Sequence, residues 1–332
     1  MKVGLDVAPL LQTRAGTARW VSGLLRGLAE RPDVEVAPLT WGGPGRWTAV
    51  ARDVLWYPAL LPRAAARASA DVLHCTIFRG PPRASLPTIV TVHDLAVLRQ
   101  PEVFPAWTRL YGRTALRPTL RAADRVFAVS EFSKREAVEL ARIDADRVDV
   151  VPNALEPVFG AAGPRLEGEY VLAVGTLEPR KNLARVVDAT ARAGVELRLV
   201  GERGWGDAGA SGASGAHVSW LGRIDDDQLA AAYRGARCLV FPSLYEGSGI
   251  PALEAMACGT PVVTSAGGAL EEVTGGAAVL VDPLDPAAIA AGIAEADRRR
   301  DELVGRGLER ARYYTWERAL DAAVAGYRRA LS

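Results

Sequence analysis

The sequence predicts an α/β protein made of two domains, each built on a doubly wound, mainly parallel β-sheet. The chain has 332 residues, of which 49% are apolar, and this is enough for two cores. Short apolar runs of strand length alternate with helical patterns up to Asn153, and the alternation restarts at Tyr170. Such alternation is typical of β–α units whose strands run parallel.

The boundary between the domains falls in a stretch that is poor in periodic apolar positions and rich in Gly and Pro. This stretch, "EPVFGAAGPRLEGE", spans residues 156–169. We expect an N-terminal domain at 1–158, a linker at 159–168 and a C-terminal domain at 169–310. An amphipathic helix at 311–332 ends the chain, and its spacing leaves open whether it crosses back to the N-terminal domain.

Composition narrows the function classes. No run of eighteen apolar residues occurs, and the N-terminus lacks the ordered regions of a signal peptide, so we expect a cytoplasmic protein. Three cysteines, Cys75, Cys238 and Cys258, have no metal-ligand spacing, so we interpret them as small core residues. Basic residues exceed acidic ones in the first half of the chain and the reverse holds afterwards. This asymmetry indicates that an anionic ligand or surface meets the N-terminal domain.

The stretch Tyr245–Glu254, "YEGSGIPALE", has the sequence of a phosphate-binding turn. It follows an apolar strand and precedes a helical pattern, and its glycines let backbone amides approach an anion at a helix N-terminus. Its Gly-Ser-Gly-Ile-Pro-Ala segment fits a dinucleotide fingerprint, but the strand at 261–265 ends without the ribose-binding acid of that motif. Glu246 and Glu254 flank the turn instead, and carboxylates accept the paired hydroxyls of a ribose or hexose well. The segment therefore favours a sugar nucleotide over NAD.

These residues are part of a longer match. "FPSLYEGSGIPALEAMACGTPVVTS", residues 241–265, resembles the E-x7-E signature of the retaining glycosyltransferases of family 4, whose GT-B fold has two Rossmann-like domains facing across a cleft. Four further segments match that family in order along the chain: "RAGTARW", "VTVHDL", "VSEFSKRE" with "VVPNAL", and "VGTLEPRKN". Ser248 stands where the family often has an aromatic residue and Glu271 where a proline is common, which leaves the donor sugar open.

The resemblance implies a role for each residue of a donor site. Glu254 accepts hydroxyls of the nucleotide ribose, Glu246 faces the transferred sugar, and amides of the glycine turn hold sugar and phosphate. Arg180 and Lys181 clamp the diphosphate, whose charge rises as the glycosidic bond breaks, so fixed cations favour the transition state. The donor-binding residues are Gly16, Gly175, Arg180, Lys181, Glu246, Gly247, Ser248, Gly249, Ile250 and Glu254.

The catalytic residues that the resemblance implies are His93, Glu246, Arg180 and Lys181. His93 follows an apolar strand, at the end where ligands of parallel sheets bind, and in the family a histidine here approaches the donor sugar and the reacting centre. A lone histidine is also often an ordinary, satisfied residue. Asp94 either orients His93 or is structural, and His74, after the preceding strand, is a weaker candidate.

One sequence feature could indicate a metal site, but a plainer interpretation of it is available. Asp225 and Asp227 have the spacing of the Asp-x-Asp pair of metal-dependent glycosyltransferases, but Asp225 with Gln228 also forms a capping box before a helical pattern. Divalent cations need several convergent oxygens, and Arg180 and Lys181 already supply positive charge. We expect a nucleoside diphosphate sugar as donor substrate and no metal.

Two segments, 50–68 and 107–123, combine arginines with Trp and Leu. The second carries arginines at four-residue spacing, interrupted by Pro118, at Arg109, Arg113, Arg117 and Arg121. The residues that could contact an acceptor or an anionic membrane are Asp94, Arg109, Arg113 and Arg117; the plainer interpretation is a solvated face. Peripheral association with the inner membrane face stays open. A net charge of only +1 and the lack of a matching motif argue against nucleic acid.

We expect a retaining, metal-independent glycosyltransferase that moves a hexose from a nucleoside diphosphate sugar to a hydroxyl acceptor. The family implies front-face attack, in which the leaving phosphate helps to deprotonate the acceptor. Mannose from GDP-mannose is a guess from family frequency, with glucose or N-acetylglucosamine from UDP donors as alternatives. The acceptor is a glycan, a lipid-linked glycan or a small molecule. Two other functions stay open: an NAD-dependent oxidoreductase that uses the Gly-Ser-Gly turn, and a sugar-nucleotide-binding sensor without catalysis.

Overall fold

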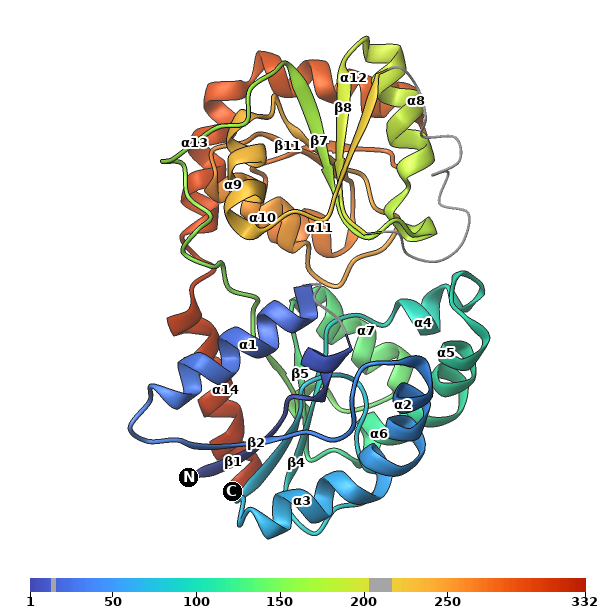
Figure 1. The fold of residues 1–332 in the computed structure, drawn as a ribbon, viewed down its shortest axis with the longest axis vertical. Helices are drawn as coiled ribbons and strands as arrows, with labels where there is room; N and C mark the ends of the chain where they lie inside the picture. The colour runs from blue at the N-terminus through green and yellow to red at the C-terminus, as the bar shows by residue number, and fades with distance from the viewer. Residues whose placement is uncertain (13–15, 203–216) are drawn as a thin grey trace. The chain divides into compact units, whose positions relative to one another are not determined.

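The computed structural model describes residues 1–12, 16–202 and 217–332, and the chain divides into two compact units (Figure 1). Unit 1 consists of Met1–Pro101, Ala106–Ala154 and Thr315–Ser332, and unit 2 consists of Leu155–Tyr314 with Glu102–Pro105. Two features of the sequence lie outside the described residues: part of the first glycine turn, at 13–15, and the small, polar loop at 206–216.

Unit 1 contains a six-stranded parallel sheet in the order β2-β1-β3-β4-β5-β6. Its strands are β1 (Lys2–Asp6), β2 (Glu35–Leu39), β3 (Val72–Cys75), β4 (Thr88–Val92), β5 (Arg125–Ala128) and β6 (Val148–Val150). Strand β4 is buried at every position, as is typical of a parallel sheet covered on both faces. Because β1, β3 and β4 are neighbours, the residues that follow them lie close together at one edge of the sheet.

The helices of unit 1 are α1 (Gly16–Ala29), α2 (Arg46–Ala51), α3 (Leu61–Arg67), α4 (Ala96–Arg99), α5 (Ala106–Tyr111), α6 (Arg117–Ala122), α7 (Glu131–Ala141) and α14 (Trp316–Leu331). Two π-helical segments, η2 (Arg52–Leu60) and η4 (Gly112–Leu116), and two short 3-10 helices, η1 (Ala8–Leu11) and η5 (Ala145–Arg147), complete it. A further 3-10 helix, η3 (Pro101–Val103), begins at the last residue of unit 1 before the Glu102–Pro105 segment of unit 2. The arginine-bearing segment at 107–123 is therefore not one regular helix but contains three helical segments, α5, η4 and α6. The wider π-helical turn changes the side-chain period, and Pro118 falls in the first turn of α6, where no amide hydrogen is needed.

The C-terminal helix α14 belongs to the core of unit 1 (Figure 1). Its residues Leu320, Val324 and Tyr327 share one buried cluster with Trp20 and Phe127. The chain leaves unit 1 after residue 154 and returns to it at residue 315. Unit 1 is thus built from both ends of the sequence.

Unit 2 contains a second six-stranded parallel sheet, in the order β12-β11-β10-β7-β8-β9. Its strands are β7 (Tyr170–Val174), β8 (Glu196–Val200), β9 (Val218–Gly222), β10 (Leu239–Phe241), β11 (Val262–Ser265) and β12 (Val279–Val281). Its helices are η6 (Pro179–Lys181), α8 (Leu183–Ala193), α9 (Asp226–Gly235), α10 (Ile250–Ala257), α11 (Gly268–Thr274), α12 (Pro286–Arg298) and α13 (Arg300–Ala311). Two separate buried clusters line the two faces of the sheet, so the predicted fold class of two doubly wound parallel sheets is confirmed.

The expected linker at 159–168 packs within unit 2. Phe159 is buried in a core cluster, and the Leu166 amide donates a hydrogen bond to the Ala231 carbonyl at 2.9 Å. All three cysteines are buried and unpaired, as predicted. Over the described part of the chain, no helix is long and apolar enough to span a bilayer.

Candidate active-site residues

The residues expected to bind the donor follow two neighbouring strands of unit 2. Helix η6 follows β7, and the loop at 242–249 follows β10, which pairs with β7. Parallel neighbours end at the same edge of a sheet, so the two segments meet. The Leu244 amide donates to the Arg180 carbonyl at 2.8 Å, and Arg180 Nη1 donates to the Tyr245 carbonyl at 3.2 Å.

Arg180 and Lys181 converge on the carboxylate of Glu246. Lys181 Nζ donates to Glu246 Oε1 at 2.5 Å, and Arg180 Nη1 donates to Glu246 Oε2 at 2.9 Å. Arg180 also pairs with Glu178 through Nη2, at 2.6 Å. The structure therefore brings together three of the four residues expected to be catalytic, and it adds Glu178, which the sequence did not single out.

The charges in this cluster shift one another's protonation. Burial alone would raise the pKa of Glu246, but the charges of Lys181 and Arg180 outweigh burial and lower that pKa to about 2. Burial lowers the pKa of Lys181, and the Glu246 carboxylate acts in the opposite direction. The carboxylate is therefore ionised, while burial works against the charge of the lysine. A phosphate beside Lys181 would stabilise the protonated ammonium group, so the site is compatible with the expected nucleoside diphosphate.

The position of Lys181 is fixed from several sides. Asn182, at φ +61°, donates from Nδ2 to the carbonyls of Pro242 and Pro283, at 3.0 and 2.6 Å, and begins α8. The ammonium group of Lys181 lies 4.9 Å from the centroid of the Phe241 ring. Gly175 has φ +148°, and a Cβ there would lie 3.2 Å from Lys181 Cε, so the side chain of Lys181 packs directly on this glycine.

The glycine turn leads directly into the N-terminus of α10. Gly249 has φ +105°, and a Cβ at this position would lie 2.6 Å from Leu270 Cδ2, so only glycine fits without strain. It is the N-cap of α10, which begins at Ile250, and it has no side chain to accept the amide hydrogens of the first turn. Ser248 is buried and Gly247 precedes it in the same loop. Anions bind proteins at helix ends of this kind, so the turn suits the expected phosphate.

Glu254 lies one turn further along α10 and is only 2% exposed. Its Oε2 accepts a hydrogen bond from the hydroxyl of Tyr233, on α9, at 2.9 Å. A buried carboxylate with a hydrogen-bond donor is held in one orientation.

In unit 1, His93 follows β4 and is half-buried. Its Nε2 lies 2.9 Å from the main-chain oxygen of Thr76, the first residue after β3. The Trp20 ring meets the imidazole edge-on, with centroids 5.0 Å apart. Burial lowers the pKa of His93, although the Thr76 carbonyl and Asp94 act in the opposite direction.

The neighbours of His93 have structural contacts of their own. Asp94 Oδ1 accepts the Ala96 amide at 3.1 Å at the start of α4, so the bond that orients His93 comes from Thr76. His74 is fully buried between the Tyr327 hydroxyl and Thr91 Oγ1, at 2.8 and 2.7 Å, and burial lowers its pKa to about 3. His74 is thus a neutral core residue. Gly16 is the first residue of α1.

The arginines expected to form one basic stripe have different surroundings. Arg109 and Arg113 are exposed. Arg117 and Arg121 instead donate through Nε to the carbonyls of Leu140 and Ala141, at 2.7 and 2.8 Å, at the C-terminus of α7. This is a helix-capping contact, and the π-helical segment before Arg117 explains why the spacing in the sequence did not indicate it.

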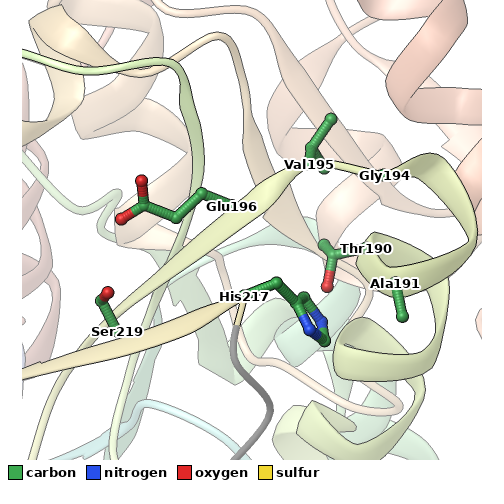
Figure 2. Close-up of a pocket in the computed structure, with 7 residues that line it drawn as sticks. All are labelled: Thr190, Ala191, Gly194, Val195, Glu196, His217 and Ser219. Carbon is green, nitrogen blue, oxygen red and sulfur yellow. The ribbon is translucent and has the colours of Figure 1, made fainter.

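A pocket of about 640 Å³ lies elsewhere in unit 2, at the amino ends of β8 and β9. Its lining residues are Thr190, Ala191, Gly194, Val195, Glu196, His217 and Ser219. Figure 2 shows the His217 ring pointing toward Thr190 and Ala191, whereas the Glu196 carboxylate points away from it. Ligands of parallel sheets bind at the carboxyl ends of the strands, and none of the expected site residues lines this pocket. We therefore do not assign the donor to it.

In the residues that the structure describes, no group of three or more His, Cys, Asp or Glu side chains is arranged to hold a metal ion. The predicted capping box is present: Asp225 Oδ1 accepts the Gln228 amide at 2.8 Å, and Gln228 Oε1 accepts the Asp225 amide at 3.2 Å. Asp225 is thus the N-cap residue of α9.

Comparison with known proteins identifies the family. The model for "Glycosyltransferase Family 4" matches residues 15–158, and the model for "Glycosyl transferases group 1" matches residues 168–296. The O-antigen chain mannosyltransferase B of Escherichia coli is 33% identical over 282 residues, which cover 76% of this chain and 74% of that protein. The chain belongs to glycosyltransferase family 4.

Other comparisons agree with this family 4 assignment. The serotype-specific mannosyltransferase WbdA of Escherichia coli is 27% identical over 275 residues, covering 74% of this chain but only 34% of WbdA. The structure of sucrose-phosphate synthase from Thermosynechococcus elongatus superposes with a TM-score of 0.76 at 22% identity, over 99% of this chain and 98% of that one. The fold is GT-B and the protein is a hexosyltransferase, so neither an oxidoreductase nor a sensor is supported.

Three contacts of the expected site residues were not predicted from the sequence. Glu178 pairs with Arg180, and the sequence indicated this contact only by placing an acidic residue two positions before the Arg-Lys pair. Tyr233 has the helical spacing of an ordinary core residue. Thr76 contributes a main-chain oxygen, which every residue has, so no sequence signal marks it.

Proposed function

We propose that this enzyme transfers a hexose from a nucleoside diphosphate sugar to a hydroxyl acceptor, with retention of configuration and without a metal ion. The observation that carries the proposal is the cluster of Arg180, Lys181 and Glu246 beside a glycine turn that begins a helix. Two fixed cations and a helix N-terminus suit a diphosphate leaving group, whose charge grows in the transition state.

The state of Glu246 supports front-face attack over double displacement. A covalent mechanism needs a carboxylate that is free to attack the anomeric carbon. Both oxygens of Glu246 are held in ion pairs, and Lys181 and Arg180 lower its pKa to about 2 against the effect of burial, so it is a weak nucleophile. We infer that Glu246 faces the transferred sugar and orients the cations, and that the leaving phosphate takes the acceptor proton.

We propose roles for the other donor-site residues on the same basis. Glu254, oriented by Tyr233, accepts hydroxyls of the nucleotide ribose. The amides of Ser248, Gly249 and Ile250 contact sugar and phosphate, with Gly247 in the same turn. Gly16, at the start of α1, and Gly175, under Lys181, allow close approach of the backbone to the ligand.

For the donor we propose GDP-mannose, because the two relatives described above are named mannosyltransferases. UDP-glucose and UDP-N-acetylglucosamine are the competing donors. The acceptor is a hydroxyl of a growing glycan, a lipid-linked glycan or a small molecule, and polysaccharide or glycoconjugate biosynthesis is the setting that the first relative's name suggests.

The test is a transfer assay with each donor and a panel of mannose-terminated and lipid-linked acceptors, with and without EDTA. We expect one donor to give a product whose anomeric configuration, measured by NMR, equals that of the donor, at the same rate in EDTA. An inverted product, or a rate abolished by EDTA and restored by a divalent cation, would contradict the mechanism. Binding of donors with no transfer to any acceptor would contradict the proposed acceptor class.

We also propose that unit 1 contacts an anionic membrane surface. Segments 50–68 and 107–123 expose large apolar side chains at Val54, Leu55, Trp107 and Leu110, and Arg109 and Arg113 are exposed in the second segment. Trp107 Nε1 donates to Asp53 Oδ2 at 2.8 Å, which joins η2 to α5. Exposed apolar residues beside arginines suit the headgroup region of an anionic bilayer.

Flotation with phosphatidylglycerol and phosphatidylcholine vesicles tests this surface. We expect binding to the anionic vesicles only, and loss of most of it in the double variant Leu55→Ser with Leu110→Ser. Leu284→Ser in unit 2, where Leu284 is 60% exposed, is the matched control and should bind like the unmodified protein. Equal binding by all three proteins, or none to either vesicle, would contradict the proposal.

A further inference from the structure

Two oppositely charged side chains are completely buried in unit 1, beside the carboxyl end of β1. Asp6 is the last residue of β1, Arg52 is the first residue of η2, and both are 0% exposed. Burial raises the pKa of Asp6 to about 7, although hydrogen bonds to its Oδ1 and the charge of Arg52 oppose this rise. A buried charge is costly unless hydrogen bonds or an opposite charge compensate it, so the contacts of this pair matter.

The hydrogen bonds of this pair use only part of each group. Asp6 Oδ1 accepts the Ala8 amide at 3.2 Å and the Trp56 indole at 3.3 Å. Arg52 Nη1 donates to two main-chain carbonyls of the loop after β2, at 3.2 and 3.0 Å. Within the described part of the chain, Asp6 Oδ2 and the Nε and Nη2 atoms of Arg52 have no hydrogen-bond partner. Buried polar atoms almost always bond to protein or to ordered water, so these atoms point to a bound molecule.

The unused atoms complement one another. Nε and Nη2 form one edge of a guanidinium group, and this edge binds a carboxylate through two hydrogen bonds, as Arg99 does with Glu136 at 3.0 and 2.6 Å. Asp6 and Arg52, both among the described residues, nevertheless form no direct ion pair. A water molecule can accept from the edge of Arg52 and donate to Asp6 Oδ2, and a buried water needs about two to four such polar partners. An anion could not donate, and the Asp6 carboxylate would repel it.

We propose that Asp6 and Arg52 enclose a site for at least one bound water molecule, and that this water-bridged pair anchors η2 to the carboxyl end of β1. The water accepts hydrogen bonds from Arg52 Nε and Nη2 and donates one to Asp6 Oδ2. Because Arg52 and Trp56 share the buried face of η2 and both bond to Asp6, directly or through water, that face is fixed at two points. The exposed side chains of η2, such as Leu55 at 50%, are thereby held facing away from the core. The bridge is independent of the proposed sugar transfer.

A crystal structure of the full chain, at a resolution that shows ordered water, tests the site without any assay of activity. Crystals are grown with and without sodium bromide. In both we expect a water molecule about 2.7–3.2 Å from Asp6 Oδ2 and from Nε or Nη2 of Arg52. A direct ion pair with no water between the two groups would overturn the inference. So would an anomalous bromide peak at the edge of Arg52, because an anion would then occupy the site.

Asp6→Asn and Arg52→Met break the bridge from either side. Each should lower the melting temperature by about 5–15 °C, because it leaves the other group buried without its counter-charge. The double variant should lose clearly less than the sum of the two single losses. Asp6→Asn combined with Arg117→Met is the matched control, since Arg117 in the same unit bonds to the Leu140 carbonyl, and its losses should add. Additive losses for Asp6 and Arg52 would reject the coupling between them.

Hydrogen exchange of backbone amides separates the anchoring of η2 from a general loss of stability. In Arg52→Met the amides of η2 should exchange about tenfold faster or more than in the unmodified protein, while those of α7, in the same unit, should change much less. Equal acceleration in η2 and α7 would reject η2 as the anchored element. If neither single variant folds, the crystal structure of the unmodified protein still decides whether the bridging water is present.

Discussion

The two units hold their candidate site residues at the same end of a parallel sheet, but by different means. In unit 2, ion pairs of 2.5 and 2.9 Å join Lys181 and Arg180 to Glu246. In unit 1, His93 is held by the main-chain oxygen of Thr76. Removing one member of a buried ion pair leaves its partner uncompensated, whereas a main-chain carbonyl cannot be removed by substitution. We therefore expect single substitutions at the site residues of unit 2 to lower turnover more than those in unit 1.

The largest effect is expected for Lys181→Ala. This change removes a cation proposed to face the diphosphate, so turnover should fall about 10³-fold while the fold, followed by circular dichroism, is retained. Lys134→Ala, a change of the same kind on α7 in unit 1, should leave turnover unaltered. If Lys181→Ala turned over like the unmodified enzyme, Lys181 would not belong to the site.

Glu246→Gln separates the two roles of this carboxylate. Turnover should fall roughly 100-fold, because the proposed contact with the transferred sugar is lost. Affinity for the free nucleoside diphosphate should rise about tenfold, because one negative charge beside two cations is gone. Isothermal titration and initial rates measure both quantities.

Glu178→Gln is the control for Glu246→Gln, since Glu178 also pairs with Arg180, at 2.6 Å. It should raise nucleotide affinity with much less loss of turnover. Equal losses of turnover in the two variants would show that Glu246 acts only through its charge and makes no contact with the sugar.

A smaller effect is expected for Tyr233→Phe, which removes the donor to the buried Glu254 carboxylate. We expect the free energy of unfolding to fall by about 1–3 kcal/mol and nucleotide affinity to fall several-fold. Tyr170→Phe removes a hydroxyl that donates to the Ala232 carbonyl in the same unit, at 2.7 Å. Tyr170→Phe should lower the free energy of unfolding by a similar amount and leave nucleotide affinity unchanged. If both variants lost affinity equally, the proposed contact between Glu254 and the ribose would be wrong.

The smallest effect is the pH dependence of stability. Lys181 and Arg180 outweigh burial and depress the pKa of Glu246 in the folded protein to about 2, below its ordinary value of 4.5. The stability from this group is therefore complete above pH 4.5 and is lost as pH falls toward 2. Melting temperatures of the unmodified protein and Glu246→Gln should converge over this range. A gap that stays constant with pH would mean that the pKa of Glu246 is not depressed.

The fold and the segments that carry the expected site residues could be predicted from the sequence, because the apolar strand runs are clear and the expected site residues follow them. Glu246 lies 66 residues from Arg180, yet both follow apolar runs that become paired parallel strands, so their meeting could be expected. The ion pair between Glu246 and Lys181 could not be expected, because the sequence analysis assigned the cations to a phosphate and the carboxylate to a sugar. Side-chain geometry decided that contact.

Other features had no sequence signal. Thr76 contacts His93 through its main-chain oxygen, which no sequence pattern marks. Tyr233 has the helical spacing of an ordinary core residue. Arg117 and Arg121 fit a basic stripe only if the helix is regular, and the π-helical segment at Gly112–Leu116 removes that regularity. The return of α14 to unit 1 depends on packing between residues that are far apart in the sequence, such as Trp20 and Tyr327.

Calorimetric titration of the full chain with GDP-mannose, UDP-glucose, UDP-N-acetylglucosamine and NAD, each with and without EDTA, tests the central claim most directly. The claim is that the Arg180–Lys181–Glu246 cluster binds the diphosphate of a sugar nucleotide. It predicts micromolar binding of one sugar nucleotide, unchanged by EDTA and lost in Lys181→Ala. Binding of NAD alone, or sugar-nucleotide binding that survives Lys181→Ala unchanged, would contradict it.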